Sequence, residues 1–218
     1  MHVTHQDLLN LEDRYRANFV NSLSGFKSAN LVGTADHEGN TNLAIVSSVF
    51  HLGANPPLIG MISRPHSVAR DTLENIQSVG EYTINHVNSD IWKRAHQTSA
   101  RYPREVSEFE AVGLTPQWQE GVRAPFVAES RLKYSLALRS SQTIDLNGVV
   151  LLIGEITHLH VEREAIAEGG YIDIESLGSI AVSGLDNYHV TDSLGSSLMP
   201  SLTPDQRFLV SRQRPLRP

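Results

Sequence analysis

The sequence predicts a mainly β protein, specifically a β-barrel with helices at its periphery. Several segments have the length and the apolar pattern of strands, and turn sequences typical of β-hairpins join some of them. Helical periodicity is confined to segments inserted between these strands. Strands and helices do not alternate regularly along the chain, which argues against a doubly wound α/β sheet.

The chain begins with a predicted amphipathic helix over residues 6–23, because apolar residues recur there at helical spacing. They are Leu8, Leu11, Tyr15, Phe19 and Leu23. A predicted hairpin follows, with strands over residues 29–35 and 41–52 and a turn that contains Gly39. Pro56 and Pro57 form the next turn, because neither has an N–H for a sheet ladder.

The remaining elements are predicted from changes in the spacing of apolar residues along the chain. Apolar residues 58–62 predict a buried strand, and a short helix follows over residues 67–77. Ser89 is predicted to cap a helix over residues 89–100. Further strands are expected over residues 81–87, 131–138, 149–161 and 179–183. The irregular stretch 101–121 is typical of a lid, a binding loop or an interface arm.

Length and composition fit one packed domain. The chain has 218 residues, of which 40% are hydrophobic and 19% charged. We expect an N-terminal helix in residues 1–24, a barrel domain in residues 25–190 and a C-terminal arm in residues 191–218. The net charge of −6 argues against a general nucleic-acid-binding protein, which would present a basic face.

The absence of cysteine excludes whole classes of site. Disulfides, thiolate zinc sites, iron–sulfur clusters and cysteine nucleophiles all need this residue. No apolar run reaches the roughly 18 residues of a membrane span. The first residues are polar and do not form a secretory signal, so the expected compartment is the cytoplasm.

Residues 63–72 combine groups that bind phosphate. Ser63 and Arg64 lie in a turn, and Arg70 and Thr72 lie in the first turns of the helix that follows. Hydroxyl groups, two guanidinium groups and a helix N-terminus are suited to hold a phosphate. A cation is locally unfavourable at a helix N-terminus, so an anionic ligand would explain Arg70.

The strand before this turn is suited to a flat polar ring. It offers a run of backbone amides beside small side chains, at Asn42, Ala44, Ile45, Val46, Ser47 and Ser48. Because side chains alternate along a strand, Ser47 and Ser48 cannot both point directly at one site. A contact through backbone amides is therefore as good an interpretation as a contact through the hydroxyl groups.

The histidines do not predict a metal site. His158 and His160 are expected to share a strand face, but no third ligand is evident nearby. We interpret this pair as a polar strand face, and we expect His189 at the surface or at an interface. The motifs of serine hydrolases, P-loop proteins, zinc proteases and dinucleotide-binding folds are all absent from the sequence.

Several motifs together resemble the flavin reductase-like, FMN-binding split-barrel flavoproteins, which include flavoredoxins and NAD(P)H:flavin oxidoreductases. The motifs are Asn42–Phe50, similar to the family's Asn-x-Ala-Pro-x-Ser run, Pro56-Pro57, Arg70-Asp71-Thr72 with Asn75-Ile76, Glu81–Asn85, Ser107–Phe109 with Gly113-Leu114, and Gly184–Tyr188. Two positions depart from the family pattern. Ile45 stands where many members have proline, and Arg70 where many have lysine.

The resemblance implies a split barrel that forms a homodimer and binds FMN non-covalently near the subunit interface. It also implies that the ten residues named above, from Asn42 to Thr72, contact this cofactor. Electrons would arrive as hydride from NAD(P)H, which would bind transiently over the flavin because no dinucleotide fingerprint is present. No catalytic side chain is assigned.

Three functions fit this resemblance. An NAD(P)H-dependent flavin reductase is favoured by the series of motifs. A flavoredoxin-like electron carrier would have no substrate pocket of its own. A split-barrel binding protein without catalytic activity would have lost the flavin.

Overall fold

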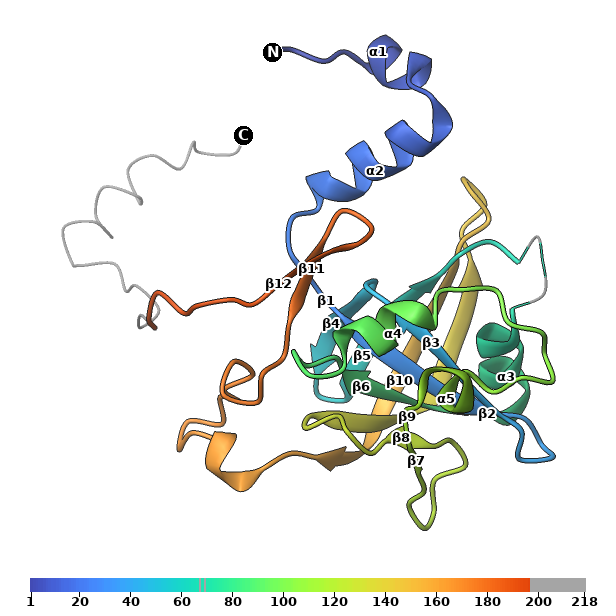
Figure 1. Ribbon diagram of the computed structural model, residues 1–218, viewed down its shortest axis with the longest axis vertical. Coiled ribbons are helices and arrows are strands. Elements are labelled where there is room, and N and C mark those ends of the chain that lie inside the picture. The colour runs from blue at the N-terminus through green and yellow to red at the C-terminus, as the bar shows by residue number, and fades with distance from the viewer. Residues whose placement is uncertain (67, 69, 197–218) are drawn as a thin grey trace, which may run out of the picture.

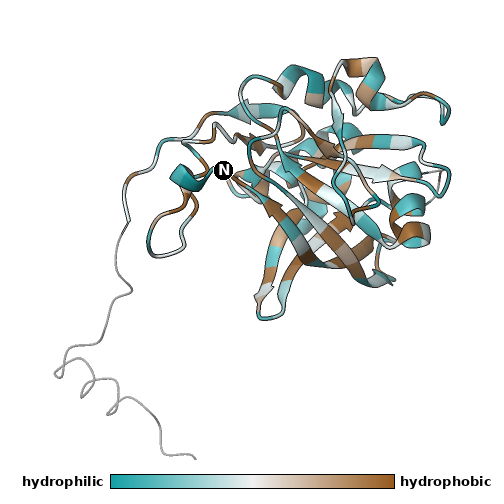
Figure 2. Cartoon of the chain, turned by 90° about the horizontal axis from the view of Figure 1, so that it is seen from below, coloured by the Kyte–Doolittle hydropathy of each residue, from teal (hydrophilic) through white to brown (hydrophobic). Residues whose placement is uncertain are grey.

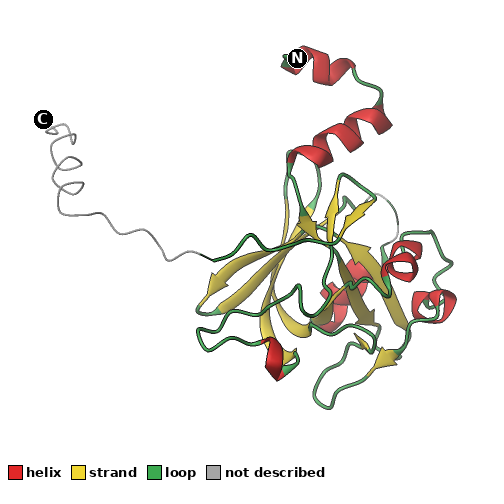
Figure 3. Ribbon diagram, turned by 60° about the vertical axis from the view of Figure 1, so that its left-hand side comes forward, coloured by secondary structure: helices red, strands yellow, loops and turns green. Residues whose placement is uncertain are grey.

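The computed structural model describes residues 1–66, 68 and 70–196. Its main feature is a seven-stranded sheet in the order β3-β2-β6-β9-β10-β5-β4, in which all neighbouring strands are antiparallel. Figure 1 shows this sheet curled around a core, and Figure 3 shows the helices lying at its periphery. The predicted barrel with peripheral helices is confirmed, and the sheet remains open because β3 and β4 are unpaired edges of it.

The strands of the large sheet vary widely in length, as the sequence predicts. They are β2 (Asn30–Ala35), β3 (Thr41–Val46), β4 (Val49–Ala54), β5 (Pro57–Ser63), β6 (Glu81–His86), β9 (Lys133–Thr143) and β10 (Val150–His160). Two small sheets join β1 (Lys27–Ser28), β11 (Ala181–Ser183) and β12 (Asn187–His189), and β7 (Pro116–Gln117) with β8 (Phe126–Val127).

The helices are short. They are α1 (His5–Asn10), α2 (Asp13–Leu23), α3 (Asp71–Val79), α4 (Trp92–Gln97), α5 (Glu108–Val112) and the 3-10 turn η1 (Arg163–Ala165). None of these helices is long and apolar enough to cross a membrane. The part of the expected C-terminal arm from residue 197 onward lies outside the described residues.

Two cores occupy the two faces of the sheet. The inner core lies inside the curl and includes Val32, Tyr82, Leu136 and Leu152, with Leu73 of α3 packed among them. The second core lies between β2, β3 and the elements outside them, chiefly α4 and α5. In Figure 2 the apolar residues colour much of the sheet, whereas the outlying helices and loops are more mixed. Strand β3 therefore separates two packed layers.

The predicted N-terminal helix is wrong in one respect, because two helices replace it. Thr4 begins α1 with a capping box, and the Glu12 carboxylate begins α2 by accepting the N–H groups of Arg14 and Tyr15. The apolar period runs through the break, so it could not reveal that a new cap starts at Glu12. Figure 1 shows both helices standing away from the barrel.

Other boundaries also differ from the prediction. The expected strand 41–52 is broken into β3 and β4 at Ser47 and Ser48. Helix α3 begins at Asp71 rather than at residue 67. The N–H of Arg70, the residue before it, donates to the Glu74 carboxylate. Helix α4 begins after Ile91, so Ser89 is not its cap.

Candidate functional site

The Ser47–Ser48 corner joins the two open edges of the large sheet, because it connects β3 directly to β4. The corner is fixed to β5 by two hydrogen bonds. The Ser48 hydroxyl donates to the carbonyl of Ile62 at 2.6 Å, and the Ile62 N–H donates to the carbonyl of Ser48 at 3.1 Å. The end of β5, and with it Ser63, is thus held beside the corner.

The first turn of α3 is fixed to the other end of β3. The Asn42 side-chain amide donates to the Thr72 hydroxyl at 2.8 Å and to the Thr34 hydroxyl at 3.2 Å. Asn75 donates to the same Thr34 hydroxyl at 3.2 Å. These contacts join β3, the corner, the end of β5 and the first turn of α3. We call the described residues of these segments, 42–48, 62–66, 68 and 70–72, the seam site.

The strand register sorts the predicted residues of β3 into two faces. Asn42, Ala44 and Val46 lie opposite Thr34, Val32 and Asn30 of β2, so all of them share the inner face. Leu43 and Ile45 point the other way and join the core that includes α4 and α5. The Ile45 side chain is therefore turned away from the seam site.

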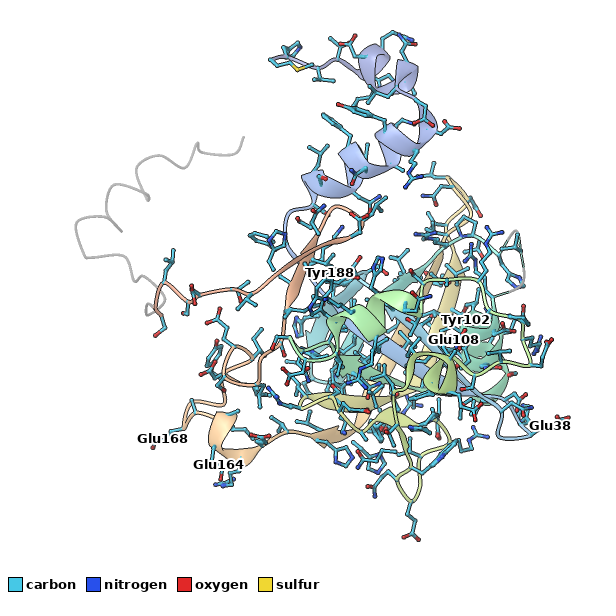
Figure 4. All side chains as sticks on the ribbon, in the orientation of Figure 1. Glu38, Tyr102, Glu108, Glu164, Glu168 and Tyr188 are labelled. Atoms are coloured by element: carbon cyan, nitrogen blue, oxygen red, sulfur yellow. The ribbon has the colours of Figure 1, made fainter. Side chains whose placement is uncertain are left out.

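Two of the β3 amides that point away from β2 are already occupied. The Leu43 N–H donates to the Glu108 carboxylate and the Ile45 N–H to the Thr98 hydroxyl, both at 2.9 Å. Glu108 belongs to α5, beside the long loop that carries Tyr102 in Figure 4. Within the described part of the chain, the N–H groups of Ser47 and Ser48 have no such partner. The corner is the part of the strand that can still donate to a ligand.

The side chains predicted to bind a phosphate belong to the part of the seam site that leads into α3. Arg70 is the N-cap residue of α3, and no side chain caps this helix. Its guanidinium is anchored by one bond from Nε to the carbonyl of Pro65, at 2.8 Å. Neither Arg64 nor Arg70 forms an ion pair with any described residue. Two cations and the free N–H groups of a nine-residue helix are thus available to an anion.

The acidic residues in the first turn of α3 do not cancel these cations. Arg104 approaches Asp71 at 3.5 Å and Glu74 at 3.1 Å. Glu74 also accepts from His66, which is the main reason that its pKa is lowered, and from the Arg70 N–H. Arg104 offsets part of this negative charge, and neither carboxylate forms an ion pair with Arg64 or Arg70.

The residues present fit a flavin that carries a phosphate. Free N–H groups that suit a polar ring lie at the corner, and free N–H groups that suit a phosphate lie at the start of α3. The structure brings Asn42 and Thr72 into direct contact, and Ser48 and Ser63 onto adjoining strand ends.

Four residues of this region were missed by the sequence prediction. Thr34, Asn75, Thr98 and Glu108 fix the two edges of β3. Asn75 and Glu108 lie inside motifs of the family resemblance, and this was the one available signal for them. Thr34 and Thr98 are buried threonines in no motif, and only the tertiary structure brings them to β3.

The three histidines discussed in the sequence analysis lie outside the seam site. His158 shares a hydrogen bond of 3.1 Å with the Ser135 hydroxyl, His160 packs edge-on against Phe126, and His189 bonds the Ser183 hydroxyl at 2.8 Å. Across residues 1–66, 68 and 70–196, no group of three or more His, Asp or Glu side chains is placed to hold a metal ion.

Comparison with known proteins identifies the family. Residues 23–175 match the model of the flavin reductase like domain. The chain therefore belongs to the flavin reductase like domain family. A protein described as a putative flavin reductase with split barrel domain, from Shewanella frigidimarina, is 54% identical, with a TM-score of 0.89 over 92% of this chain and 100% of that chain.

More distant relatives of this flavin reductase-like protein share its sequence or its fold. An uncharacterized protein of Halalkalibacterium halodurans is 32% identical over 156 residues, which are 69% of this chain and 74% of that protein. The flavoredoxin of Desulfovibrio vulgaris is 22% identical, with a TM-score of 0.66 over 83% of this chain and 93% of that chain, and it shares the fold. The family and its split-barrel fold support a flavin as cofactor and a flavin-associated oxidoreductase activity.

The hydrogen bond between the Glu108 carboxylate and the Leu43 N–H supports β3, and it can be tested through the protonation of Glu108. Burial of its carboxyl group raises its pKa above the ordinary value of 4.5, and nearby Asp71 adds to this, whereas the Leu43 N–H opposes it. An acid with a raised pKa in the folded state binds more protons there than in the unfolded chain. Stability must therefore fall as the pH rises from below 4.5 through that raised pKa.

We accordingly expect Glu108→Gln, which can still accept from Leu43, to gain stability relative to the wild type as the pH rises from acid to neutral. Glu108→Ala leaves the Leu43 N–H without a partner and should cost about 1–3 kcal/mol. Urea unfolding of the three proteins at acid and neutral pH measures both effects. A constant difference between Glu108→Gln and the wild type would contradict the assignment.

Proposed function

We propose that this protein is an FMN-dependent NAD(P)H oxidoreductase that acts as a flavin reductase. The single observation that carries the proposal is the seam site. The Ser47–Ser48 corner presents free backbone N–H groups, and the start of α3, with Arg70 as its N-cap residue, lies at the other end of the same site. A ring-binding end and a phosphate-binding end are what FMN requires.

Each residue then has a defined part. Arg64, Arg70 and the N–H groups that begin α3 bind the phosphate, and Thr72 is oriented for it by the bond from Asn42. The N–H groups of Ser47 and Ser48 donate to the polar edge of the ring. A bound flavin supplies the redox chemistry, and the protein binds it, orients it and excludes water from it.

The decisive experiment combines a spectrum with a steady-state assay. We expect the purified protein, after addition of FMN and removal of the excess, to show a flavin absorption spectrum and to oxidise NADH or NADPH when more FMN is supplied. Bound flavin without this oxidation would support a flavoredoxin-like carrier instead. Failure to take up FMN would leave only a binding protein without catalytic activity.

We also propose that the protein is a homodimer. Exposed apolar side chains remain on the outside of the large sheet and on α2, although the chain carries a net charge of −6. Light scattering at micromolar concentration should give twice the chain mass of 24.1 kDa. A mass near that of one chain, measured with FMN bound, would refute the dimer.

A further inference from the structure

The segment that follows β10 exposes a group of apolar side chains. Residues 165–173 form a small hairpin, in which Ile166 and Ile172 are joined by an antiparallel bridge. Ile172 packs on a small buried core, whereas Ile166, Tyr171 and Ile174 are 39%, 62% and 41% exposed. Single exposed apolar residues are ordinary, but three within nine residues form a patch, and such a patch marks an interaction surface.

The same segment is strongly acidic. Residues 162–175 include five acids and one arginine, so their net charge is −4. Figure 4 shows Glu164 and Glu168 at the outer edge of the molecule. Among the described residues, none of the five acids forms an ion pair. We call residues 162–175 the acidic hairpin, and its acids are Glu162, Glu164, Glu168, Asp173 and Glu175.

A stretch of the sequence beyond the described residues has the opposite charge. Residues 206–218 include four arginines and no acid, so their net charge is +4. Four apolar side chains stand among these arginines, at Phe208, Leu209, Val210 and Leu216. We call residues 206–218 the arginine segment. Its charge is complementary to that of the acidic hairpin, and both contain large apolar side chains.

The last described part of the chain runs beside the acidic hairpin. The Ser193 N–H donates to the Glu175 carboxylate at 2.9 Å. Figure 1 shows the acidic hairpin, in orange, and the last described residues, in red, on the same side of the barrel. Ten residues separate Ser196 from Arg207, and ten residues can span at most about 33–36 Å. The arginine segment can therefore reach the acidic hairpin of its own chain.

We propose that the arginine segment folds back onto the acidic hairpin of the same chain and covers its exposed apolar side chains. Its guanidinium groups pair with carboxylates that have no ion-pair partner among the described residues, and its apolar residues pack over Ile166, Tyr171 and Ile174. This contact is independent of the proposed flavin function, because the acidic hairpin contributes no residue to the seam site.

The covalent link favours the same chain as the occupant. An exposed ion pair strengthens a contact only about two- to fivefold, which is too little to hold two separate molecules together through a few pairs. A segment joined by a short linker acts at a roughly millimolar effective concentration, so weak contacts are sufficient for it. Burial of apolar side chains on both surfaces adds to the charge pairing.

A spin label on the arginine segment tests the contact directly, because the chain has no cysteine of its own. Full-length Ser211→Cys would carry a nitroxide label, and its amide NMR signals would be compared before and after chemical reduction of the label. We expect the label to broaden the signals of residues 162–175. The signals around Glu38, which Figure 4 places on the other side of the molecule, should stay sharp. Unbroadened signals over residues 162–175 would overturn the proposal.

Matched charge variants of the labelled protein test the basis of the contact. Glu164→Gln combined with Glu168→Gln should lower the equilibrium constant of the contact roughly tenfold, and the broadening should decrease with it. Glu105→Gln combined with Glu120→Gln is the control, because it removes the same charge from exposed acids outside the acidic hairpin. This control should leave the broadening unchanged, and an equal loss in both variants would overturn the placement of the segment.

A substitution in the arginine segment tests the apolar part of the contact. Phe208→Ser in the labelled protein should also lower the equilibrium constant roughly tenfold, because it removes a large side chain that covers the hairpin. Unchanged broadening would refute the covering of the apolar side chains.

Isotope mixing distinguishes the same chain from a second copy. Spin-labelled chains without an NMR-active isotope would be unfolded and refolded together with isotope-labelled wild-type chains. We expect no broadening over residues 162–175 in this mixture. Broadening there would mean that the arginine segment reaches a second copy, and the assignment to the same chain would then be wrong.

Discussion

Arg70→Ala should weaken FMN binding roughly ten- to a hundredfold and leave riboflavin binding almost unchanged. A charge-assisted hydrogen bond to phosphate contributes about 1.5–3 kcal/mol to binding. Riboflavin has no phosphate, so it makes no such bond and loses nothing in the variant. The structure strengthens this expectation, because Arg70 occupies the N-cap position of α3 and no described carboxylate forms an ion pair with it. Flavin fluorescence titration of each variant with both ligands measures the effect.

Three further variants sharpen this test. Arg64→Ala should behave like Arg70→Ala. Thr72→Val should cost less, about 1 kcal/mol, since it removes one hydroxyl donor to the phosphate, together with the hydroxyl that accepts from Asn42. Arg139→Ala, which breaks a surface pair with Glu155 far along the chain, should change neither affinity. If Arg70→Ala weakens FMN and riboflavin equally, the residue is structural and the phosphate lies elsewhere.

Periodicity predicted most of the fold because each strand's pattern is a local property. The apolar run of β5 is visible in the sequence whichever strands it pairs with. The Asn147-Gly148 pair between β9 and β10 is likewise a turn signal that depends only on neighbouring residues. The order of the strands in the sheet is not local. Nothing near β3 and β4 in the sequence shows that these consecutive strands form the opposite edges of one sheet.

In the candidate site, too, local features could be read from the sequence and tertiary contacts could not. The hydroxyls and guanidiniums of Ser63, Arg64, Arg70 and Thr72 are close in the sequence, so the hypothesis that they bind one phosphate needs only one turn and one helix. The corner at Ser47 and Ser48 was hidden, because strand-forming residues resume directly after the two serines, as they would in one continuous strand. The occupation of the Leu43 and Ile45 amides was hidden as well, since Glu108 and Thr98 reach them from distant segments.

Gly33 illustrates a requirement that no sequence pattern indicates. It lies inside β2, where glycine is unfavourable, opposite Leu43 of β3. The carbonyl of Pro125 passes directly over it and accepts a hydrogen bond of 2.6 Å from the Thr83 hydroxyl. A Cβ at position 33 would overlap this carbonyl and would lie 2.6 Å from that hydroxyl oxygen.

Gly33→Ala should therefore destabilise the protein by about 3 kcal/mol, since overpacking forces the backbone at Pro125 or β2 itself to move. The melting temperature should fall by roughly 6–12 °C. Gly169→Ala is the matched control, because a Cβ there meets no atom within 4 Å, and it should be neutral or slightly stabilising. Thermal unfolding of both variants decides the matter. Equal melting temperatures would mean that the Pro125 segment moves aside without cost.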